Sequence, residues 1–391
     1  MLLGIGLLGG LAFTISLVAT FAMIRIAPRI GFTDKPGTRK IHHVPKPLGG
    51  GVGIYLGLVL PLLFVASVLA VVDPPPPPPV GVNETFEELP VEFFGLVSVD
   101  AALVRGAQAQ LPLAMAFLGC LTAMHVMGLA DDVLNLGPFI KLAVQLAAAA
   151  VLAVIFPEMR VLTTLGPALS IIVTVLWITA VTNAFNFLDN MDGLSAGVAA
   201  VCTVAFLLTT LLIAQWFVAA TLAVLLGAVM GFLVFNFPPA RIFQGDAGSL
   251  LLGFTLGVLT VRTTYLPPES ATDEAWGAGW YAVFAPVIVL ALPLYDLVTV
   301  SIIRISQGRS PFQGDTNHFS HRLVARGMSR RTAVLCLYLV TAATSAAAVI
   351  LPYTTTGVAA VMVFAQTLLI LGVVALLEQH PVRPPATEPT R

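Results

Sequence analysis

The chain has 391 residues, of which 58% are hydrophobic and only 10% are Asp, Glu, Lys or Arg, and its mean hydropathy is +0.95. A soluble domain carries about 25% charged residues, so this composition excludes an ordinary soluble globular protein and a disordered one. The formal net charge of −1 provides no basic field for nucleic acid, and no nucleic-acid partner is expected.

Apolar stretches long enough to cross a membrane recur along almost the whole chain. We expect about eleven spans, at residues 2–24, 50–72, 111–130, 142–157, 168–187, 194–214, 216–236, 248–265, 279–303, 332–351 and 355–377. The predicted fold class is an all-α, polytopic transmembrane helical bundle, with one integral-membrane domain over residues 1–380. Residues 73–110 are expected to form a Pro-rich, acidic external loop, and residues 381–391 a disordered cytoplasmic tail.

Lysine and arginine are concentrated in alternate loops. Sixteen of the 19 fall in the loops 25–49, 128–141, 187–193, 237–247, 304–331 and 378–391. The positive-inside rule places these loops in the cytoplasm, and an odd number of spans then puts the N-terminus outside and the C-terminus inside. Up to the last span, every acidic residue on this side is an aspartate, whereas the opposite loops mix Asp and Glu. A short carboxylate repeated on one face indicates ligands held in fixed positions.

The first polar cluster joins spans three and four. Asp131 and Asp132 end span three, and Lys141 opens span four after a short turn. Adjacent carboxylates at a membrane edge repel each other unless a cation or a proton relieves them, and Lys141 supplies positive charge for a phosphate. A turn whose acids cap a helix is the alternative interpretation.

The second cluster is the segment 183–194 at the end of span five. At about 100° per residue, Asn183, Asn186 and Asn190 share one stripe of a helix, with Asp189 beside it. Amide and carboxylate oxygens suit a hard cation, Mg²⁺ or Mn²⁺, and Mg²⁺ usually shares its coordination shell with substrate phosphates. Asparagines that join helices through hydrogen bonds are the alternative.

The third cluster, residues 243–249, leads into span eight. Gly245 and Gly248 let the backbone approach a ligand closely, and Asp246 and Ser249 lie where a helix begins, a position that favours anions. A capped helix start would give the same pattern.

Two further loops on this side are rich in cations and histidines. In the last large inner loop, His318 and His321 precede Arg322, a combination that suits phosphate oxygens, whereas a zinc site lacks a third soft ligand. The loop 34–51 contains Lys46 and either contacts substrate or anchors to anionic lipid.

The chain contains no Walker A sequence and no GxGxxG that follows a predicted strand, so nothing in it supplies energy from ATP. Cation ligands, lysine and carboxylates at a lipid–water boundary suit the transfer of a phosphoryl-linked group from a soluble nucleotide to a lipid phosphate.

These motifs, in this order, resemble the signature of the polyprenyl-phosphate N-acetylhexosamine-1-phosphate transferases, glycosyltransferase family 4. The stretch Arg39–Gly50 is similar to the substrate loop of the WecA/TagO-type branch, and the similarity runs from about residue 30 to about residue 327. The resemblance implies that UDP-sugar and undecaprenyl phosphate give undecaprenyl-diphosphate-sugar and UMP, which initiates a cell-envelope polysaccharide. It also implies Mg²⁺ or Mn²⁺ as cofactor, an active site on the cytoplasmic face of the inner (plasma) membrane, and a homodimer as one possible assembly.

On this resemblance, the metal ligands are Asp246 and Asn186. Lys141 matches the lysine that binds the diphosphate, and Asp131 or Asp132 matches the residue proposed to deprotonate or orient the lipid phosphate.

The resemblance assigns further residues to the reaction and to the substrates. Asp189 and His318 join the catalytic set. The substrate-binding set comprises Asp192, Asn236 and Phe243 for uridine, Lys46 in the substrate loop, and His321 and Arg322 for phosphate and sugar.

The sequence departs from the family pattern at the residues implied to contact the sugar. Asn190 follows Asp189 where the family has glycine, and Ser320 occupies the third place of the histidine motif. The triple-histidine motif of the MraY-type enzymes is missing, which favours UDP-GlcNAc over the donor of a phospho-MurNAc-pentapeptide transferase.

A membrane transporter is the alternative from a different class, but its ionisable residues should lie near the midplane of the bilayer. A non-catalytic membrane scaffold is a third interpretation.

Overall fold

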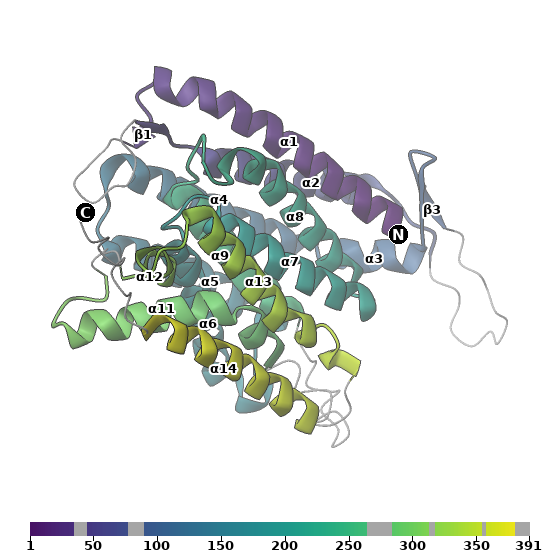
Figure 1. The fold of residues 1–391 in the computed structure, drawn as a ribbon. Helices are drawn as coiled ribbons and strands as arrows, with labels where there is room; N and C mark the ends of the chain where they lie inside the picture. The colour runs from purple at the N-terminus through teal and green to yellow at the C-terminus, as the bar shows by residue number, and fades with distance from the viewer. Residues whose placement is uncertain (35–44, 77–89, 264–283, 313–316, 354–356, 380–391) are drawn as a thin grey trace, which may run out of the picture.

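The structure is a computed structural model of the chain and describes residues 1–34, 45–76, 90–263, 284–312, 317–353 and 357–379. Long helices packed side by side make up most of it (Figure 1). In chain order they are α1 (Leu2–Arg29), α2 (Gly50–Val71), α4 (Leu111–Leu134), α5 (Pro138–Ile155), α6 (Pro167–Leu188), α7 (Leu194–Leu212), α8 (Trp216–Asn236), α9 (Asp246–Thr263), α11 (Ala291–Ser306), α13 (Arg330–Ala348) and α14 (Gly357–Gln379).

The shorter elements are helices and two small antiparallel sheets. The helices are α3 (Ala101–Ala109), α12 (Phe319–Ala325) and the 3₁₀ helices η1 (Pro157–Met159), η2 (Thr163–Leu165) and η4 (Leu351–Tyr353), and the sheets pair β1 (Thr33–Asp34) with β2 (Lys46–Pro47) and β3 (Val91–Phe93) with β4 (Val97–Val99).

The helices lie where the apolar stretches predicted spans. Among the described residues, nine helices are long and apolar enough to cross a membrane, so the chain is an all-α, multi-pass membrane protein. The other two predicted spans overlap with α9, which contains the charged Asp246 and Arg262, and with α11, which is 16 residues long. The count of eleven spans and the sides of the two termini stay predictions.

Part of the predicted external loop has regular structure. The segment 73–110 contains the β3–β4 hairpin and the nine-residue helix α3, which begins where the Asp100 carboxylate accepts a hydrogen bond from Ala102 N (2.8 Å). Gln108 Nε2 donates to the carbonyls of Leu69 (2.9 Å) and Val72 (2.7 Å), so α3 packs over the end of α2. The described parts of this segment therefore contain regular secondary structure, its external location stays a prediction, and residues 77–89 lie outside the described residues.

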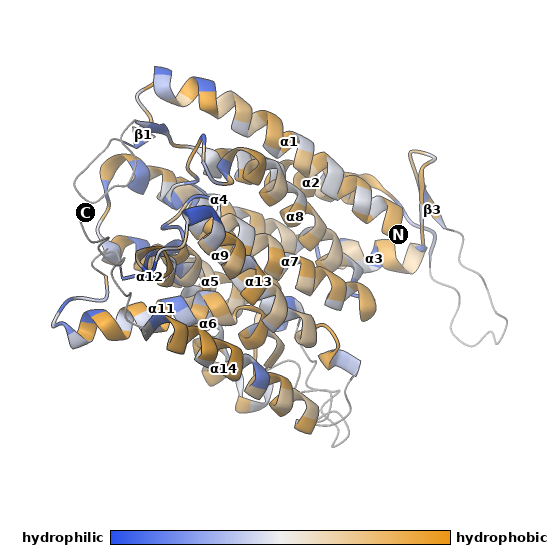
Figure 2. Cartoon of the chain, in the orientation of Figure 1, coloured by the Kyte–Doolittle hydropathy of each residue, from blue (hydrophilic) through white to orange (hydrophobic). Residues whose placement is uncertain are grey.

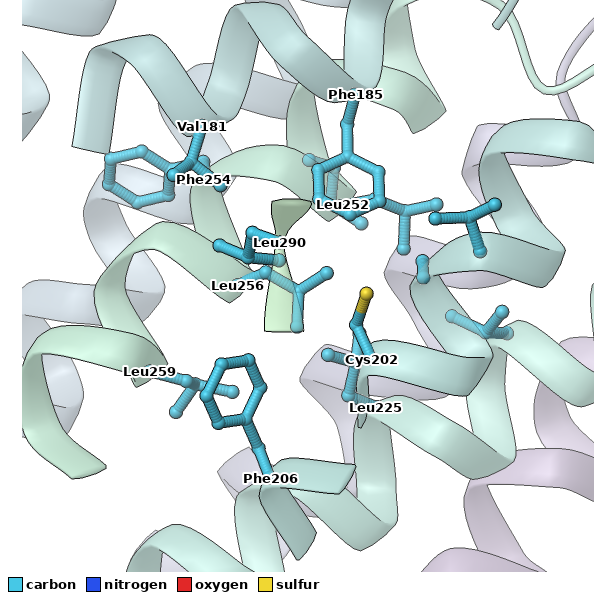
Figure 3. Close-up of a cluster of buried hydrophobic side chains, with 14 of the residues drawn as sticks. Val181, Phe185, Cys202, Phe206, Leu225, Leu252, Phe254, Leu256, Leu259 and Leu290 are labelled. Atoms are coloured by element: carbon cyan, nitrogen blue, oxygen red, sulfur yellow. The ribbon is translucent and has the colours of Figure 1, made fainter. Parts of the chain in front are cut away.

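Helix α9 forms the centre of the bundle. Nearly all of its residues are buried, and it packs against α2, α4, α6 and α7. Leu252, Phe254 and Leu256 of α9 meet Phe185 of α6 and Cys202 of α7 in one apolar cluster (Figure 3). A helix enclosed by protein does not need the uniform apolar surface that lipid demands, and this explains why α9 is less apolar than the other spans.

The start of α9 is held very close to α4. A Cβ atom placed on Gly128 of α4 would lie 2.5 Å from Ala247 Cα and 2.7 Å from Asp246 O. Only glycine permits this approach, which places the first turn of α9 beside the C-terminal end of α4.

The loops that the charge pattern placed on one side meet at one end of the bundle. Pro47 O accepts from Phe243 N (2.9 Å), the Asp192 carboxylate accepts from Ala240 N (2.9 Å), and Ser320 Oγ donates to Asn190 Oδ1 (2.5 Å). Figure 2 shows hydrophilic segments gathered at this end, which carries β1 and α12. We call it the site end of the bundle.

Candidate active site

The turn between α4 and α5 brings Lys141 back to Asp131. Asn135 ends α4 in the left-handed conformation (φ 51°), with its N–H bonded to Asp131 O (2.8 Å), and Pro138 opens α5. Lys141 then lies in the first turn of α5, and its Nζ atom contacts Asp131 Oδ2 at 2.9 Å. The sequence prediction that these two residues act together is consistent with this geometry.

Lys141 also reaches α9. Its Nζ atom lies 2.8 Å from Asp246 Oδ2, so one ammonium group joins carboxylates from two helices. The side chains of Lys141, Asp131 and Asp246 are 22%, 12% and 25% exposed, so the triad is open to a ligand yet largely shielded from water. Asp131 Oδ1 is buried and accepts no hydrogen bond from any described residue.

Asp132 has a different role from its neighbour. Its Oδ1 and Oδ2 atoms accept hydrogen bonds from the backbone N–H groups of Asp246 (2.8 Å) and Ala247 (3.2 Å). This carboxylate therefore caps the N-terminus of α9 from another helix, where a negative charge is favourable. Gly245 has φ +69°, and a Cβ on it would lie 2.4 Å from Asp132 Oδ2, so only glycine leaves room for this cap.

The asparagines of the second cluster join the helices around Asp246. Asn186 Nδ2 donates to Asp246 Oδ1 (3.0 Å) and to Ser249 Oγ (2.9 Å). Asn183 Nδ2 donates to Gln145 Oε1 (2.5 Å), which links α6 to α5. The two predicted metal ligands are thus neighbours, and the hydrogen bonds between helices that formed the alternative interpretation are also present.

Asp189 lies just beyond the end of α6. Burial raises the pKa of the Asp189 carboxyl well above its usual range, and the negative charges of Asp246 and Asp132 raise it further. Positive charge added near Asp189 would favour the ionised form of its carboxyl.

Two predicted uridine-pocket residues organise the loops of the site end. Asp192 Oδ2 accepts from Ala240 N (2.9 Å). Asn236 is 4% exposed, and its amide accepts from Gly193 N (2.9 Å) and donates to Ile242 O (2.8 Å). Both residues hold the 237–245 loop against the segment after α6, and a direct contact with a nucleotide stays a prediction for each.

The described part of the substrate loop docks on the same 237–245 loop. Lys46 Nζ donates to Ala240 O, and Phe243 exchanges backbone hydrogen bonds with Pro47 and Gly50 (2.9 Å each). Lys46 and Phe243 are therefore close to each other and to the start of α9. The remainder of this loop, residues 35–44, lies outside the described residues, as does Asp315.

His318 is buried and is fixed by Asp296, to which the sequence assigned no role, and by Arg304, which the sequence places upstream of the same histidine loop. Its Nδ1 atom lies 2.8 Å from Asp296 Oδ2, and its Nε2 atom lies 3.4 Å from an Arg304 nitrogen. Asp296 was counted among the inner-face aspartates without a role. An ionisable residue within an apolar span is a signal of function, and that signal could have singled it out.

Arg322 and His321 follow on α12. Arg322 donates to Asn317 O (2.7 Å) and forms an ion pair with Glu378 of α14 (2.7 Å). The rings of His318 and His321 lie 6.4 Å apart. Glu378 was a further residue that the sequence did not assign, because it is the last acid of a long apolar helix.

Comparison with known proteins identifies the class of this multi-pass membrane protein. The profile of glycosyl transferase family 4 matches residues 114–264, which include Asp131, Lys141, Asp189 and Asp246. A Mycobacterium tuberculosis protein named decaprenyl-phosphate N-acetylglucosaminephosphotransferase is 31% identical over 360 residues, which cover 86% of this chain and 79% of that protein. The chain belongs to glycosyl transferase family 4, and the predicted family is confirmed.

Two other relatives have related names. A Bacillus subtilis protein named probable undecaprenyl-phosphate N-acetylglucosaminyl 1-phosphate transferase is 29% identical over 366 residues, 90% of this chain and 87% of that protein. The Escherichia coli undecaprenyl-phosphate alpha-N-acetylglucosaminyl 1-phosphate transferase is 24% identical over 357 residues, 87% of this chain and 82% of that protein. The similarity therefore extends over most of each chain.

Proposed function

We propose that this enzyme transfers N-acetylglucosamine 1-phosphate from UDP-GlcNAc to a polyprenyl phosphate, with undecaprenyl phosphate as the expected acceptor, and releases UMP. The observation that supports this most is the contact of Lys141 with both Asp131 and Asp246, which brings the first and third polar clusters together at one point. The names of the relatives support N-acetylglucosamine as the sugar and a polyprenyl phosphate as the acceptor. The product is suited to initiate a cell-envelope polysaccharide.

The main obstacle to this reaction is electrostatic. The donor diphosphate and the lipid phosphate are both anionic, so each repels the other as they approach. Lys141 is placed between two helices where it can screen that repulsion, and Arg322 adds positive charge from α12. The lipid phosphate is largely ionised near neutral pH, so it needs orientation more than deprotonation. We assign the orientation of this phosphate to Asp131.

We propose a single displacement. An oxygen of the lipid phosphate attacks the β-phosphorus of UDP-GlcNAc, a new phosphoanhydride bond forms, and the bond from the β-phosphorus to the UMP oxygen breaks. One phosphoanhydride replaces another, so no ATP is required. In the rival route an aspartate attacks first. Its carboxylate would meet the same electrostatic repulsion from the donor diphosphate, without the benefit of an acceptor held in the membrane.

The residues present fit Mg²⁺ in one specific way. Among the described residues, no three His, Cys, Asp or Glu side chains converge to hold a metal. Mg²⁺, however, commonly binds through one or two protein oxygens and completes its shell with water and substrate phosphates. We propose Asp246 and Asn186 as its protein ligands, with Mn²⁺ as a substitute, and Asp131 Oδ1 is a nearby buried oxygen without a hydrogen-bond donor. Such an ion supplies charge neutralisation to the transferring diphosphate.

We assign donor binding to the loops that surround this centre. Asp192, Asn236 and Phe243 are proposed to form the uridine pocket, with Lys46 beside it on the substrate loop. His321 and Arg322 are proposed to contact phosphate and sugar.

The distribution of positive charge supports a cytoplasmic location for the site end. Its loops hold most of the Lys and Arg residues, and UDP-sugars are soluble nucleotides. We therefore propose the inner (plasma) membrane as the location. A homodimer stays a prediction.

Purified protein tests this function with UDP-GlcNAc, UDP-GalNAc and UDP-MurNAc-pentapeptide as donors. We expect UMP release from UDP-GlcNAc that requires both polyprenyl phosphate and Mg²⁺. Equal or greater release from UDP-MurNAc-pentapeptide would move the proposal to the pentapeptide transferases, and no release from any donor would contradict a transferase.

A further inference from the structure

Asp296 is a carboxylate inside α11 with no exposed surface. Its Oδ2 atom lies 2.8 Å from His318 Nδ1, and its Oδ1 atom accepts a hydrogen bond from Phe319 N at 2.8 Å. Both oxygens of this one carboxylate therefore hold the first residues of α12. A charge is costly to bury, so a carboxylate with both oxygens committed to one short segment indicates a specific purpose.

The partner on the other side of His318 determines where the imidazole proton lies. An Arg304 nitrogen lies 3.4 Å from His318 Nε2, and Arg304 is 2% exposed. A guanidinium group has donors and no acceptor, so His318 Nε2 must be the acceptor. The proton of a neutral imidazole then lies on Nδ1 and is donated to Asp296.

This network is connected to the centre of the site. The Arg304 guanidinium lies 4.9 Å from the centre of the Phe187 ring, and the His318 ring meets the same ring edge-on at 5.9 Å. Phe187 directly follows Asn186, a proposed metal ligand. Ser320 Oγ donates to Asn190 Oδ1 (2.5 Å), so α12 is attached to the 186–192 segment at two points.

Arg304 also fixes the loop that precedes α12. Its second guanidinium nitrogen donates to Pro311 O at 2.7 Å. The carboxylate, the imidazole and the guanidinium thus hold both the end of α11 and the start of α12.

We propose that Asp296 is a positioning residue for the transfer reaction. Its carboxylate accepts from Nδ1 and so fixes His318 in the Nδ1–H form, which leaves Nε2 to accept from Arg304 and holds α12, with His321 and Arg322, against the site. His318 then supports the reaction as a hydrogen-bond acceptor and does not donate a proton to the leaving group. This inference rests on the proposed function, because it is the phosphate and sugar contacts of α12 that the network would fix.

Asp296→Asn distinguishes this role from simple packing. Asparagine has the same shape but only one side-chain oxygen, so it cannot accept from both Phe319 N and His318 Nδ1. If the oxygen keeps Phe319, the amide NH₂ faces Nδ1, and the imidazole must place its proton on Nε2, opposite the Arg304 donor. The loss of an aspartate that fixes a histidine tautomer is known to lower kcat with little change of geometry.

A double-mutant cycle tests whether Asp296 acts through His318. We expect Asp296→Asn to lower kcat for UMP release by about tenfold or more in the wild-type background, and by less than about twofold in the His318→Gln background. Fold losses that multiply in the double variant would overturn the proposal. Asp100→Asn is the matched control, because Asp100 also caps a helix through a carboxylate but belongs to α3, on the segment predicted to be external; it should keep wild-type kcat.

A spectroscopic measurement on the unsubstituted protein does not depend on the folding or activity of any Asp296 variant. With ¹⁵N-histidine labelling, the His318 signal is the one missing from the His318→Gln spectrum. We expect the Nδ1–H form at neutral pH, and an Nε2–H or doubly protonated ring would overturn the proposal. If the wild-type protein releases no UMP while this signal shows Nδ1–H, the proposed function fails and the tautomer assignment stands.

Discussion

Lys141 Nζ and Asp246 Oδ2 lie 2.8 Å apart, although 105 residues separate them in the chain. The same ammonium group contacts Asp131, so its removal leaves two largely shielded carboxylates facing each other. The Lys141 ammonium therefore both stabilises the arrangement of these two carboxylates and supplies the positive charge that the proposed reaction needs.

Lys141→Gln should reduce the rate of UMP release by roughly 100-fold, because the charge that screens the two phosphates is lost. Lys141→Arg should retain part of the activity, since it keeps the charge but presents a planar fork in place of a compact ammonium. The measurement is kcat at saturating donor and acceptor. A glutamine variant with more activity than the arginine variant would contradict the role of charge.

Asp131 and Asp132 are adjacent, yet their replacement by asparagine should have different consequences. Asp132→Asn removes one of two acceptors that cap α9 and should lower stability by about 1 kcal/mol. Asp131→Asn removes no backbone hydrogen bond and should leave the unfolding midpoint near that of wild type while activity falls sharply. Thermal unfolding in detergent, beside the activity assay, separates the two effects. The same midpoint for both variants would show that the cap of α9 adds nothing.

Gly245→Ala should destabilise the site end by about 1–2 kcal/mol, because Gly245 has φ +69° and its Cβ would press on the Asp132 carboxylate. Gly119→Ala is the control, since nothing lies within 4 Å of a Cβ at Gly119 in α4. The unfolding midpoint measures both changes. If the two variants unfold together, the close approach of Gly245 and Asp132 is not required.

The raised pKa of Asp189 predicts how stability depends on pH without a divalent cation. An acid whose pKa is higher in the folded than in the unfolded state binds more protons when folded, so stability falls as the pH rises from the unfolded pKa through the folded pKa. In EDTA, the unfolding midpoint should fall as the pH is raised above about 4, the usual pKa of an aspartate, and Mg²⁺ should reduce that fall because it favours the ionised carboxylates.

Asp189→Asn tests the assignment of this dependence to Asp189. It should flatten the pH dependence measured in EDTA. An unchanged slope in the variant would place the titration on another group.

Sequence alone predicted which residues meet and left open how each is used. Asp131, Lys141 and Asp246 could be placed together because they occur at ends of spans that the charge pattern assigned to one side. The role of Asp132 could not be predicted, since it depends on backbone N–H groups more than 100 residues away. The role of Asn236 could not be predicted either, because its amide joins two loops that are adjacent only in the folded chain.

Asp296 and α3 were missed for different physical reasons. Asp296 lies within an apolar stretch, so the sequence indicated that burying this carboxylate is costly but did not show its partner, which lies at the start of α12. Helix α3 is only nine residues long and directly follows the β3–β4 hairpin, so no periodic pattern of sufficient length was present.

Isotope exchange distinguishes a direct transfer between UDP-GlcNAc and a lipid phosphate at the Lys141–Asp246 centre from a route through a covalent enzyme intermediate. Labelled UMP is incubated with UDP-GlcNAc and purified, lipid-free enzyme, and parallel reactions contain polyprenyl phosphate or the Asp246→Asn variant. For direct transfer we expect no exchange of label into UDP-GlcNAc without lipid, and exchange with net UMP release when lipid is present. Asp246→Asn should show less than about a tenth of wild-type turnover at saturating Mg²⁺. Exchange without lipid, at a rate comparable to turnover, would contradict direct transfer.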